Sequence, residues 1–436
     1  MSQQSNSHPG IKYLPFLIVT LVLYIGFAIE RTDTLQLLSF YTLAFALYLF
    51  LLFHEKTQSL KIILTASISC AFLLCFSFPK LSDDIYRFIW DGRCWLNGIH
   101  PFSATPRQIL ALNIDGLDNS LFQKLNSKDY FTIYPLCNQL IYAFTAGLTN
   151  DIWVQAFLLK LIYFVSHLIS IKYILLILEV YKLPANRIAV IALSPLFLIE
   201  TTGNLHPEVL MIAMLSVGIY FMIKGKILQS AFYWTLSICS KMHPLLLLAS
   251  LVFRKNIKQN FLLGILIAFF TLVMWAPLVV STAFFSSLDL YFRKFEFNAS
   301  IYYLCREIGY QQKGYNMIQY IGPLLGGATV IICLAISWYK RKEEQAFSAM
   351  EYMFFTWLLL TTTVHPWYLI IGIFLASFTG NVIAILWSLW IFYSYHNYGN
   401  AIFHENPIIT LYFYLGLCIS IILWRIVFKN LRYARA

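Results

Sequence analysis

The densest group of chemically active side chains lies in residues 82–102, which read SDDIYRFIWDGRCWLNGIHPF. Asp83, Asp84, Arg87, Asp91 and Arg93 fall within this one segment. If residues 84–96 are helical, Asp84, Arg87 and Asp91 share one face, because they follow the i, i+3, i+7 spacing of a helix. Adjacent carboxylates beside arginines can provide a general base or a cation site, since nearby charges alter how strongly a carboxyl holds its proton.

The alternative for this segment is a solvated loop with helix-capping aspartates and surface ion pairs, each of which contributes little. Four aromatic residues, Tyr86, Phe88, Trp90 and Trp95, are interleaved with the charges. They indicate that the segment lies against a membrane, where charged side chains are costly and are usually retained for function. We therefore favour a functional role for the charges.

Three other segments contain polar residues between apolar runs. ETTGNLHPEVL (200–210) places His206 and Glu208 in a tight connection behind Glu200, and CSKMHP contains Lys241. His365 in TTTVHPWY opens a helix behind a proline, and a helix N-terminus favours anions. The ordinary alternatives are a polar turn, a lysine that reaches the interface and a plain helix cap. A fourth segment, residues 291–309, resembles an interfacial amphipathic helix.

The elements that must position these residues are membrane helices. The chain has 436 residues, of which 59% are hydrophobic and only 12% charged, against about 25% charged in soluble proteins. Apolar runs near the ~20 residues that cross a bilayer occur at 11–29, 34–53, 60–79, 261–281, 317–339 and 408–424. The pattern predicts an all-α, polytopic transmembrane bundle of about 11–14 helices. The first run is interpreted as a retained helix rather than a signal peptide.

Loops rich in Lys and Arg predict the orientation, because such loops lie on the cytoplasmic side. We place five basic segments inside, together with the N-terminus: HEKTQSLK, KGK, RKNIKQN, KRKEEQ and the C-terminal KNLRYARA. The outer loops are then about 80–131, 201–208, 282–316 and 362–367, with 132–149 as a helix in the outer leaflet and a chain reversal near 241–244. This asymmetry explains the net charge of +11 without nucleic acid. Residues 1–436 are expected to form a single domain in the inner cell membrane, with the site on its outer side.

Several motifs also carry a resemblance to a known family. DDIYRFIWDGR (83–93), followed by NGIHPF, resembles the DD-x-YR-x-x-WDGR signature of bacterial multispanning mannosyltransferases of the GT-C class. TIYPLCNQ (132–139) is similar to the family's YPP-x-x-Q segment, and PLFLIETTGNLHPE (195–208) to its NPL…E…GxHxD/E stretch. SKMHP (240–244), FNASIYYL (297–304) and HPWYL (365–369) match in the same order. Departures occur at Leu136, at Pro207-Glu208 and at His100.

The resemblance implies a GT-C fold and transfer of a sugar, with mannose expected, from a polyprenyl-phosphate donor. The acceptor would be a hydroxyl of a glycan or lipid-linked molecule on the outer membrane face, and transfer would proceed with inversion. Asp83 or Asp84 would take the acceptor's proton. The residues expected to bind the donor phosphate or substrate are Arg87, Asp91, Arg93, His206, Glu208, Lys241 and His365. The adjacent carboxylates of Asp83 and Asp84 permit a divalent cation, Mg²⁺ or Mn²⁺, without requiring one.

The alternatives to a transferase are a transporter and a scaffold protein. A transporter or flippase of lipid-linked saccharides would show inverted repeats and charges near the middle of the membrane. The sequence shows no repeat, and its acidic residues cluster at one predicted surface. A scaffold protein would not need Asp, Arg and His in separate loops that a single site could gather. The transferase is therefore the favoured hypothesis.

Overall fold

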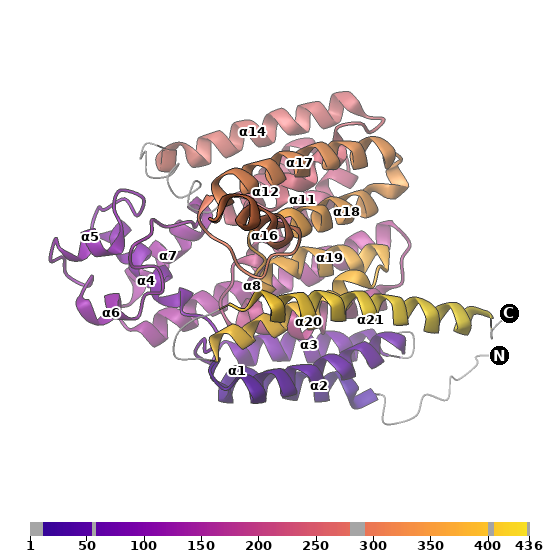
Figure 1. Cartoon of the computed structure of the whole chain (residues 1–436), viewed down its shortest axis with the longest axis horizontal. Coiled ribbons are helices and arrows are strands. Elements are labelled where there is room, and N and C mark those ends of the chain that lie inside the picture. The colour runs from indigo at the N-terminus through magenta and orange to yellow at the C-terminus, as the bar shows by residue number, and fades with distance from the viewer. Residues whose placement is uncertain (1–11, 55–57, 280–292, 400–404, 434–436) are drawn as a thin grey trace.

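A computed structural model of the chain describes residues 12–54, 58–279, 293–399 and 405–433. The described residues form helices joined by short connections, and their only β-type pairing is an isolated bridge between Phe297 and Thr363. The predicted all-α class is confirmed. Figure 1 shows most long helices running side by side, with both chain termini at one end of the bundle.

The chain begins with three apolar helices that pack on one another, α1 (Leu14–Ala28), α2 (Thr34–Phe53) and α3 (Leu60–Leu74). Their bounds agree with the first three apolar runs in the sequence. Proline in the first turn of α1 removes only an N–H that has no intrahelical partner there. The short α1–α2 connection carries Glu30 and Arg31 to the end of the bundle away from the termini.

A block of four helices follows at that same end, opposite the termini (Figure 1). It consists of α4 (Asp84–Leu96), α5 (Pro106–Leu110), α6 (Asn119–Gln123) and α7 (Leu136–Leu148). The predicted helix at 84–96 is therefore confirmed. With 13 residues, α7 is about 20 Å long, which is too short to cross a hydrocarbon core of about 30 Å.

Gly92 explains how closely α4 and α7 pack. A Cβ atom at this position would lie 2.3 Å from the carbonyl oxygen of Tyr142 in α7. Only glycine allows the two backbones to approach this far, so the glycine of the WDGR motif has a packing role.

After the long central helix α8 (Ile152–Val180), the chain forms a broken helix. Its two halves, Ala185–Ala192 and Pro195–Gly203, are bent by 58°. They contain η3 (Ala185–Ile188), α9 (Ala189–Ala192), α10 (Pro195–Leu198) and η4 (Ile199–Gly203), the last with π-helical geometry. Residues 201–208, for which an outer loop is predicted, are buried among the helices, because they lead from this broken helix into α11.

The next helices reverse direction where the sequence predicts it. α11 (Glu208–Ile223) packs along α12 (Ile227–Ser240), Lys241 is extended, and α13 (Pro244–Leu247) and η5 (Leu248–Leu251) return towards α14 (Ile257–Val279). The reversal at 241–244 is therefore confirmed. It leaves Lys241 at the tip of α12, beside the first residue of α11.

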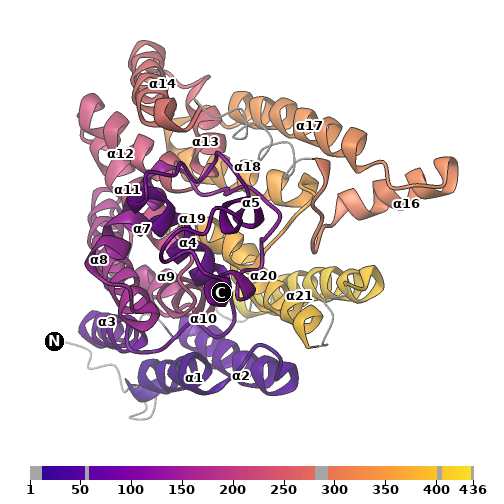
Figure 2. The same cartoon turned by 90° about the vertical axis from the view of Figure 1, so that its left-hand side faces the viewer.

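The remaining helices close the bundle. They are α16 (Ile301–Lys313), α17 (Ile318–Tyr339), η6 (Glu343–Gln345), α18 (Ala346–Leu360), η7 (Pro366–Leu369), α19 (Ile370–Thr379), α20 (Ile383–Phe392), η8 (Tyr393–Tyr398) and α21 (Pro407–Tyr433). Figure 2 shows α16 at the edge of the bundle beside α17. Its exposed Ile301, Leu304 and Ile308 give it an apolar stripe, as expected for the amphipathic segment at 291–309, of which residues 291–292 lie outside the described part.

Five described helices are long and apolar enough to cross a membrane, and the bent pair could form a sixth crossing. The five are Thr34–Phe53, Ile152–Val180, Ile257–Leu278, Ile318–Tyr339 and Pro407–Val427. Four shorter apolar helices accompany them. The multi-pass prediction is confirmed, while the total of about 11–14 helices stays a prediction based on the apolar pattern.

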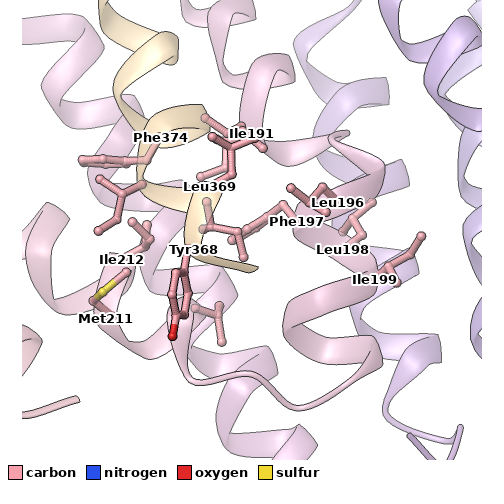
Figure 3. Packing of buried hydrophobic residues seen from close by; sticks show 14 of the residues in the cluster. Ile191, Leu196, Phe197, Leu198, Ile199, Met211, Ile212, Tyr368, Leu369 and Phe374 are labelled. Carbon is pink, nitrogen blue, oxygen red and sulfur yellow. The ribbon is translucent and has the colours of Figure 1, made fainter. Parts of the chain in front are cut away.

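The main hydrophobic core extends along the chain from Leu14 to Leu417. Figure 3 shows its centre, where α10 and α11 meet the segment after α18. Phe197 and Leu198 of α10, Met211 and Ile212 of α11, and Leu369 of η7 are buried together there. This packing fixes the broken helix against η7, and both elements carry site residues.

Candidate active site

Arg87 and Asp91 form a buried ion pair on one face of α4. Arg87 Nε lies 2.7 Å from Asp91 Oδ1, and both side chains are at most 3% exposed. Arg87 Nη1 also donates to the carbonyls of Ser127 and Tyr130. The second oxygen of Asp91 accepts from the Thr132 hydroxyl at 2.5 Å and from Gln139 Nε2 at 3.0 Å. These contacts attach the loop before α7, and α7 itself, to α4.

Arg93 lies on the opposite side of the same helix. It is nine positions after Asp84, which corresponds to about half a turn of rotation at 100° per residue. Its guanidinium donates to the carbonyls of Gly116 and Asn150 at 2.7 and 2.8 Å. Arg93 therefore connects two loops by hydrogen bonds and does not lie beside Asp84.

The two adjacent aspartates face different partners. Asp83 forms an ion pair with Arg31 from the α1–α2 connection. Asp84 instead accepts from Asn126 Nδ2 at 2.8 Å and from the Tyr134 hydroxyl at 3.0 Å. Burial, followed by the charge of Asp84, raises the pKa of Tyr134 well above its usual value, so this phenol keeps the proton that it donates. The side chain of Asp84 is 17% exposed.

Because Asp83 and Asp84 contact different partners, they are not arranged to bind one divalent cation together. Within the described ranges, no group of three or more His, Cys, Asp or Glu side chains is arranged to hold a metal ion. Asp83 and Asp84 do not face a common point, since one is held by Arg31 and the other by Asn126 and Tyr134.

His206 approaches Asp84 from the turn between η4 and α11. Its Nε2 lies 3.8 Å from Asp84 Oδ2 and has no hydrogen-bond partner, although the side chain is only 1% exposed. Its Nδ1 lies 3.0 Å from both the carbonyl oxygen and Oε2 of Glu200. The Tyr395 hydroxyl from η8 donates to the fully buried Glu200 carboxylate at 2.9 Å.

Glu208 and Lys241 form a second buried pair near this turn. Glu208 Oε1 lies 2.6 Å from Lys241 Nζ, and the Glu208 side chain is fully buried. The pair forms because α11 begins at Glu208 and α12 ends just before Lys241. Lys241 Nζ also lies 5.4 Å from the centre of the Tyr368 ring, which is within range of a cation–π interaction.

A column of stacked rings connects His206 to the loop before α16. The ring centroids are 3.7 Å apart for His206 and Trp367, 4.5 Å for Trp367 and His365, and 4.8 Å for His365 and Phe297. Phe297 is held by backbone hydrogen bonds to Thr362 and Val364. Burial, followed by the charges of Lys241 and His206, lowers the pKa of His365 well below its usual value, so this ring stays neutral.

The structure therefore divides the residues that the sequence singled out. One connected group of contacts contains Asp84, His206, Glu208, Lys241 and His365. Arg87 and Asp91 lie beside it with their charges satisfied internally, Asp83 is held by Arg31, and Arg93 points away.

Sequence reasoning gave no role to four residues that complete the group. They are Tyr134, Glu200, Trp367 and Tyr395. Tyr134 and Trp367 stand inside the quoted motifs, and Glu200 is an acidic residue that directly follows an apolar run. No local pattern distinguishes Tyr395, whose role depends on tertiary packing.

The structure gathers a partly exposed carboxylate, a buried histidine and a lysine at one end of a helical bundle whose long helices could cross a membrane. Residues 21–255 match the family model described as alpha-(1->6)-mannopyranosyltransferase, N-terminal domain. The match covers more than half of the chain, so the protein belongs to this family and is a membrane glycosyltransferase of the mannosyltransferase type. The comparisons with curated proteins and with solved structures gave no match.

The family assignment confirms the resemblance drawn from the motifs. It also favours the transferase over the transporter and the scaffold, since the family's description is that of an enzyme. The matched region includes Asp84, Glu200, His206, Glu208 and Lys241. Trp367, His365 and Tyr395 come from the part of the chain beyond it.

Proposed function

We propose that this protein transfers mannose from a polyprenyl-phosphate donor to a hydroxyl of a glycan or lipid-linked acceptor, with inversion, on the non-cytoplasmic side of the membrane. The family description supports an α-(1→6) linkage, in which the acceptor hydroxyl is that of a sugar C6. The observation that carries the proposal is the placement of Asp84. It is the partly exposed carboxylate in the group, and it has no arginine or lysine as an ion-pair partner among the described residues.

Asp84 is assigned as the general base. The acceptor oxygen would form a bond to the anomeric carbon of mannose as the bond from that carbon to the phosphate oxygen breaks. The acceptor's proton moves to Asp84 Oδ2. A single displacement of this kind inverts the configuration at the anomeric carbon. Asp83 is less suited to the role, because Arg31 already neutralises it.

Lys241 is assigned to the departing polyprenyl phosphate. Cationic donors stabilise the negative charge that grows on a leaving phosphate. Glu208, as a carboxylate, would repel a phosphate, so its role is to hold Lys241 in position before the donor arrives. His365 and Trp367 form the adjacent wall.

The positions of the chain ends and of the α4–α7 block support the proposal that the site lies on the outer face. The two termini lie at one end of the bundle and α4 to α7 at the other (Figure 1). Because loops rich in Lys and Arg face the cytoplasm, we take the basic C-terminal segment as inside, and the proposal then has Asp84 on the outer side. The same placement makes the membrane lipid around the bundle the route by which a polyprenyl donor reaches the site.

The test uses the purified protein in liposomes with a mannoside acceptor and labelled donors. Polyprenyl-phosphate mannose, polyprenyl-phosphate glucose and a nucleotide-linked mannose are supplied separately. We expect labelled product with polyprenyl-phosphate mannose alone, with the anomeric configuration inverted relative to the donor. Product from the nucleotide-linked sugar alone, or no transfer from any of the three donors, would overturn the proposal.

A further inference from the structure

The buried contacts of His206 fix which of its two ring nitrogens can exchange a proton. Nδ1 faces two oxygen atoms of Glu200, its carbonyl and its carboxylate, both at 3.0 Å. Neither oxygen carries a proton to donate when Glu200 is ionised, so Nδ1 must be the donor. Nε2 is left free of hydrogen bonds and directed at Asp84.

The distance between Nε2 and Asp84 indicates a contact that depends on a proton. At 3.8 Å, the two atoms are beyond a direct hydrogen bond. A neutral His206 presents a lone pair to a carboxylate oxygen, which is unfavourable. A proton placed between the two atoms makes the contact attractive. With this geometry, the two side chains can form a hydrogen bond once Asp84 takes up a proton.

Glu200 is placed to stabilise a positive charge on the ring. It is fully buried, and among the described residues His206 is its only ion-pair partner. A buried carboxylate behind an imidazole favours the imidazolium that forms when the ring takes a proton, as in Ser-His-Asp triads. The Tyr395 hydroxyl contacts both carboxylate oxygens of Glu200, at 2.9 and 3.1 Å, and holds its orientation.

The backbone of this turn is distorted in a way that maintains the contact. Glu200 lies in a single π-helical turn, and Leu205 has a positive φ of 63°, which is uncommon for a residue with a branched side chain. These features bring the His206 N–H to the Glu200 carbonyl at 3.1 Å. Strained backbone of this kind persists where the surrounding structure enforces it, often at functional sites.

We propose that Glu200 and His206 form a proton relay behind Asp84, so that the effective base is the Asp84–His206 pair. The acceptor hydroxyl gives its proton to Asp84, the proton passes from Oδ2 to His206 Nε2, and Asp84 returns to its charged form. After the product leaves, the proton returns through Asp84 to solvent, because His206 has no other exposed atom. The relay rests on the proposed function. His206 acts on Asp84, and Glu200 and Tyr395 are positioning residues that do not touch substrate.

The experiment compares kcat and KM of Glu200→Gln, Glu200→Asp and Tyr395→Phe in liposomes with polyprenyl-phosphate mannose and a mannoside acceptor. In Ser-His-Asp triads, replacing the carboxylate that orients the histidine lowers kcat by up to about 10⁴-fold, so Glu200→Gln should lower kcat by at least about 10-fold and leave both KM values within about twofold. Glu200→Asp should recover part of the rate, and Tyr395→Phe should show a smaller loss. Glu351→Gln is the matched control, since Glu351 is a buried carboxylate that accepts from Thr379 and Asn381.

A second variant keeps the proposal testable if Glu200→Gln does not fold. His206→Ala leaves a space beside Asp84, and added imidazole should restore part of its lost kcat. A wild-type kcat in Glu200→Gln, an equal loss in Glu351→Gln, or a His206→Ala enzyme that does not respond to imidazole would overturn the relay. Absence of mannosyl transfer by the unmodified protein would instead reject the proposed function, so the two failures can be told apart.

Discussion

Asp84 and His206 face each other across 3.8 Å, although one opens α4 and the other lies in the turn before α11. The contact exists because the broken helix ends inside the bundle and because α4 begins at the same end. It joins the most charged segment of the sequence to one of its most buried turns.

The two adjacent aspartates should respond differently to the same substitution. Asp84→Asn should lower kcat by about 100-fold or more, since a general base contributes about 10²–10⁴-fold to a rate. Asp83→Asn should retain most activity and lose at most about 1 kcal/mol of stability, the usual value of a half-exposed ion pair. Steady-state kinetics and thermal unfolding of both variants check this. Equal losses of activity would contradict the assignment of Asp84 as the base.

Substitutions of Lys241 and Glu208 should show that donor binding and stability depend on this pair in different ways. Lys241→Met should raise the KM for the donor and lower the stability, because it leaves the buried Glu208 carboxylate unpaired, a change that costs about 3–5 kcal/mol. The double variant Lys241→Met/Glu208→Gln should recover stability and keep the high donor KM. Donor titrations and melting curves of the three proteins provide the measurement. An unchanged donor KM in both variants would remove Lys241 from the phosphate site.

Arg87 should act through the structure of the α4–α7 block. Arg87→Ala leaves Asp91 buried without its charged partner, so we expect a loss of about 3–5 kcal/mol in stability. Arg87→Lys should also be destabilising, because lysine cannot place several fixed donors on Asp91 and the 127–130 loop at once. Arg93→Ala should lower stability without altering the donor KM. A selective rise in donor KM in the arginine variants would argue for a direct phosphate contact.

Gly92 allows a sharp test of helix packing. Gly92→Ala places a methyl group 2.3 Å from the carbonyl oxygen of Tyr142, and overpacking of this kind costs about 1–3 kcal/mol. Gly147→Ala is the matched control, since its new Cβ would lie 3.6 Å from the nearest atom, a Leu96 methyl group. Thermal unfolding should show a clear loss for the first variant alone. Similar melting temperatures would mean that α4 and α7 are further apart than the structure has them.

His365 should make stability depend on pH. Burial, with the charges of Lys241 and His206, lowers the pKa of His365 in the folded protein. The unfolded chain therefore binds the extra proton first, with a pKa of about 6.5, and the stability from this group is present above that pH and is lost as the pH falls through it. Relative to His365→Gln, the native protein should lose melting temperature between about pH 7.5 and pH 5. A constant difference over this range would contradict the buried placement.

The sequence predicted the fold well where the signal was local. The apolar runs place both ends of α1, α2, α14 and α17 and the start of α21 within a few residues, and the helical spacing placed Arg87 and Asp91 on one face of α4. These features depend on neighbouring residues only, so periodicity and hydropathy suffice to find them.

The site was predicted less completely, because its geometry depends on distant contacts. Arg93 belongs to the same motif as Asp84, but helical rotation turns it to the far side of α4. The sequence predicted a tight polar connection at residues 201–208, but not that the bent helix buries it and pairs its charges. Tyr395 is one tyrosine among 28, and only the packing of η8 against η4 gives it a role.

The column of rings from His206 to Phe297 joins two portions of the chain. One lies inside the region that matches the family model, and the other lies after it. Asp84 and His206 lie in the region shared with the family, while Trp367 and Tyr395, which fix the histidine ring and its carboxylate, lie after residue 255. If the proposed relay operates, exchanging the C-terminal portion between two family members would change the groups that support His206 and Glu200, and the rate of transfer with them.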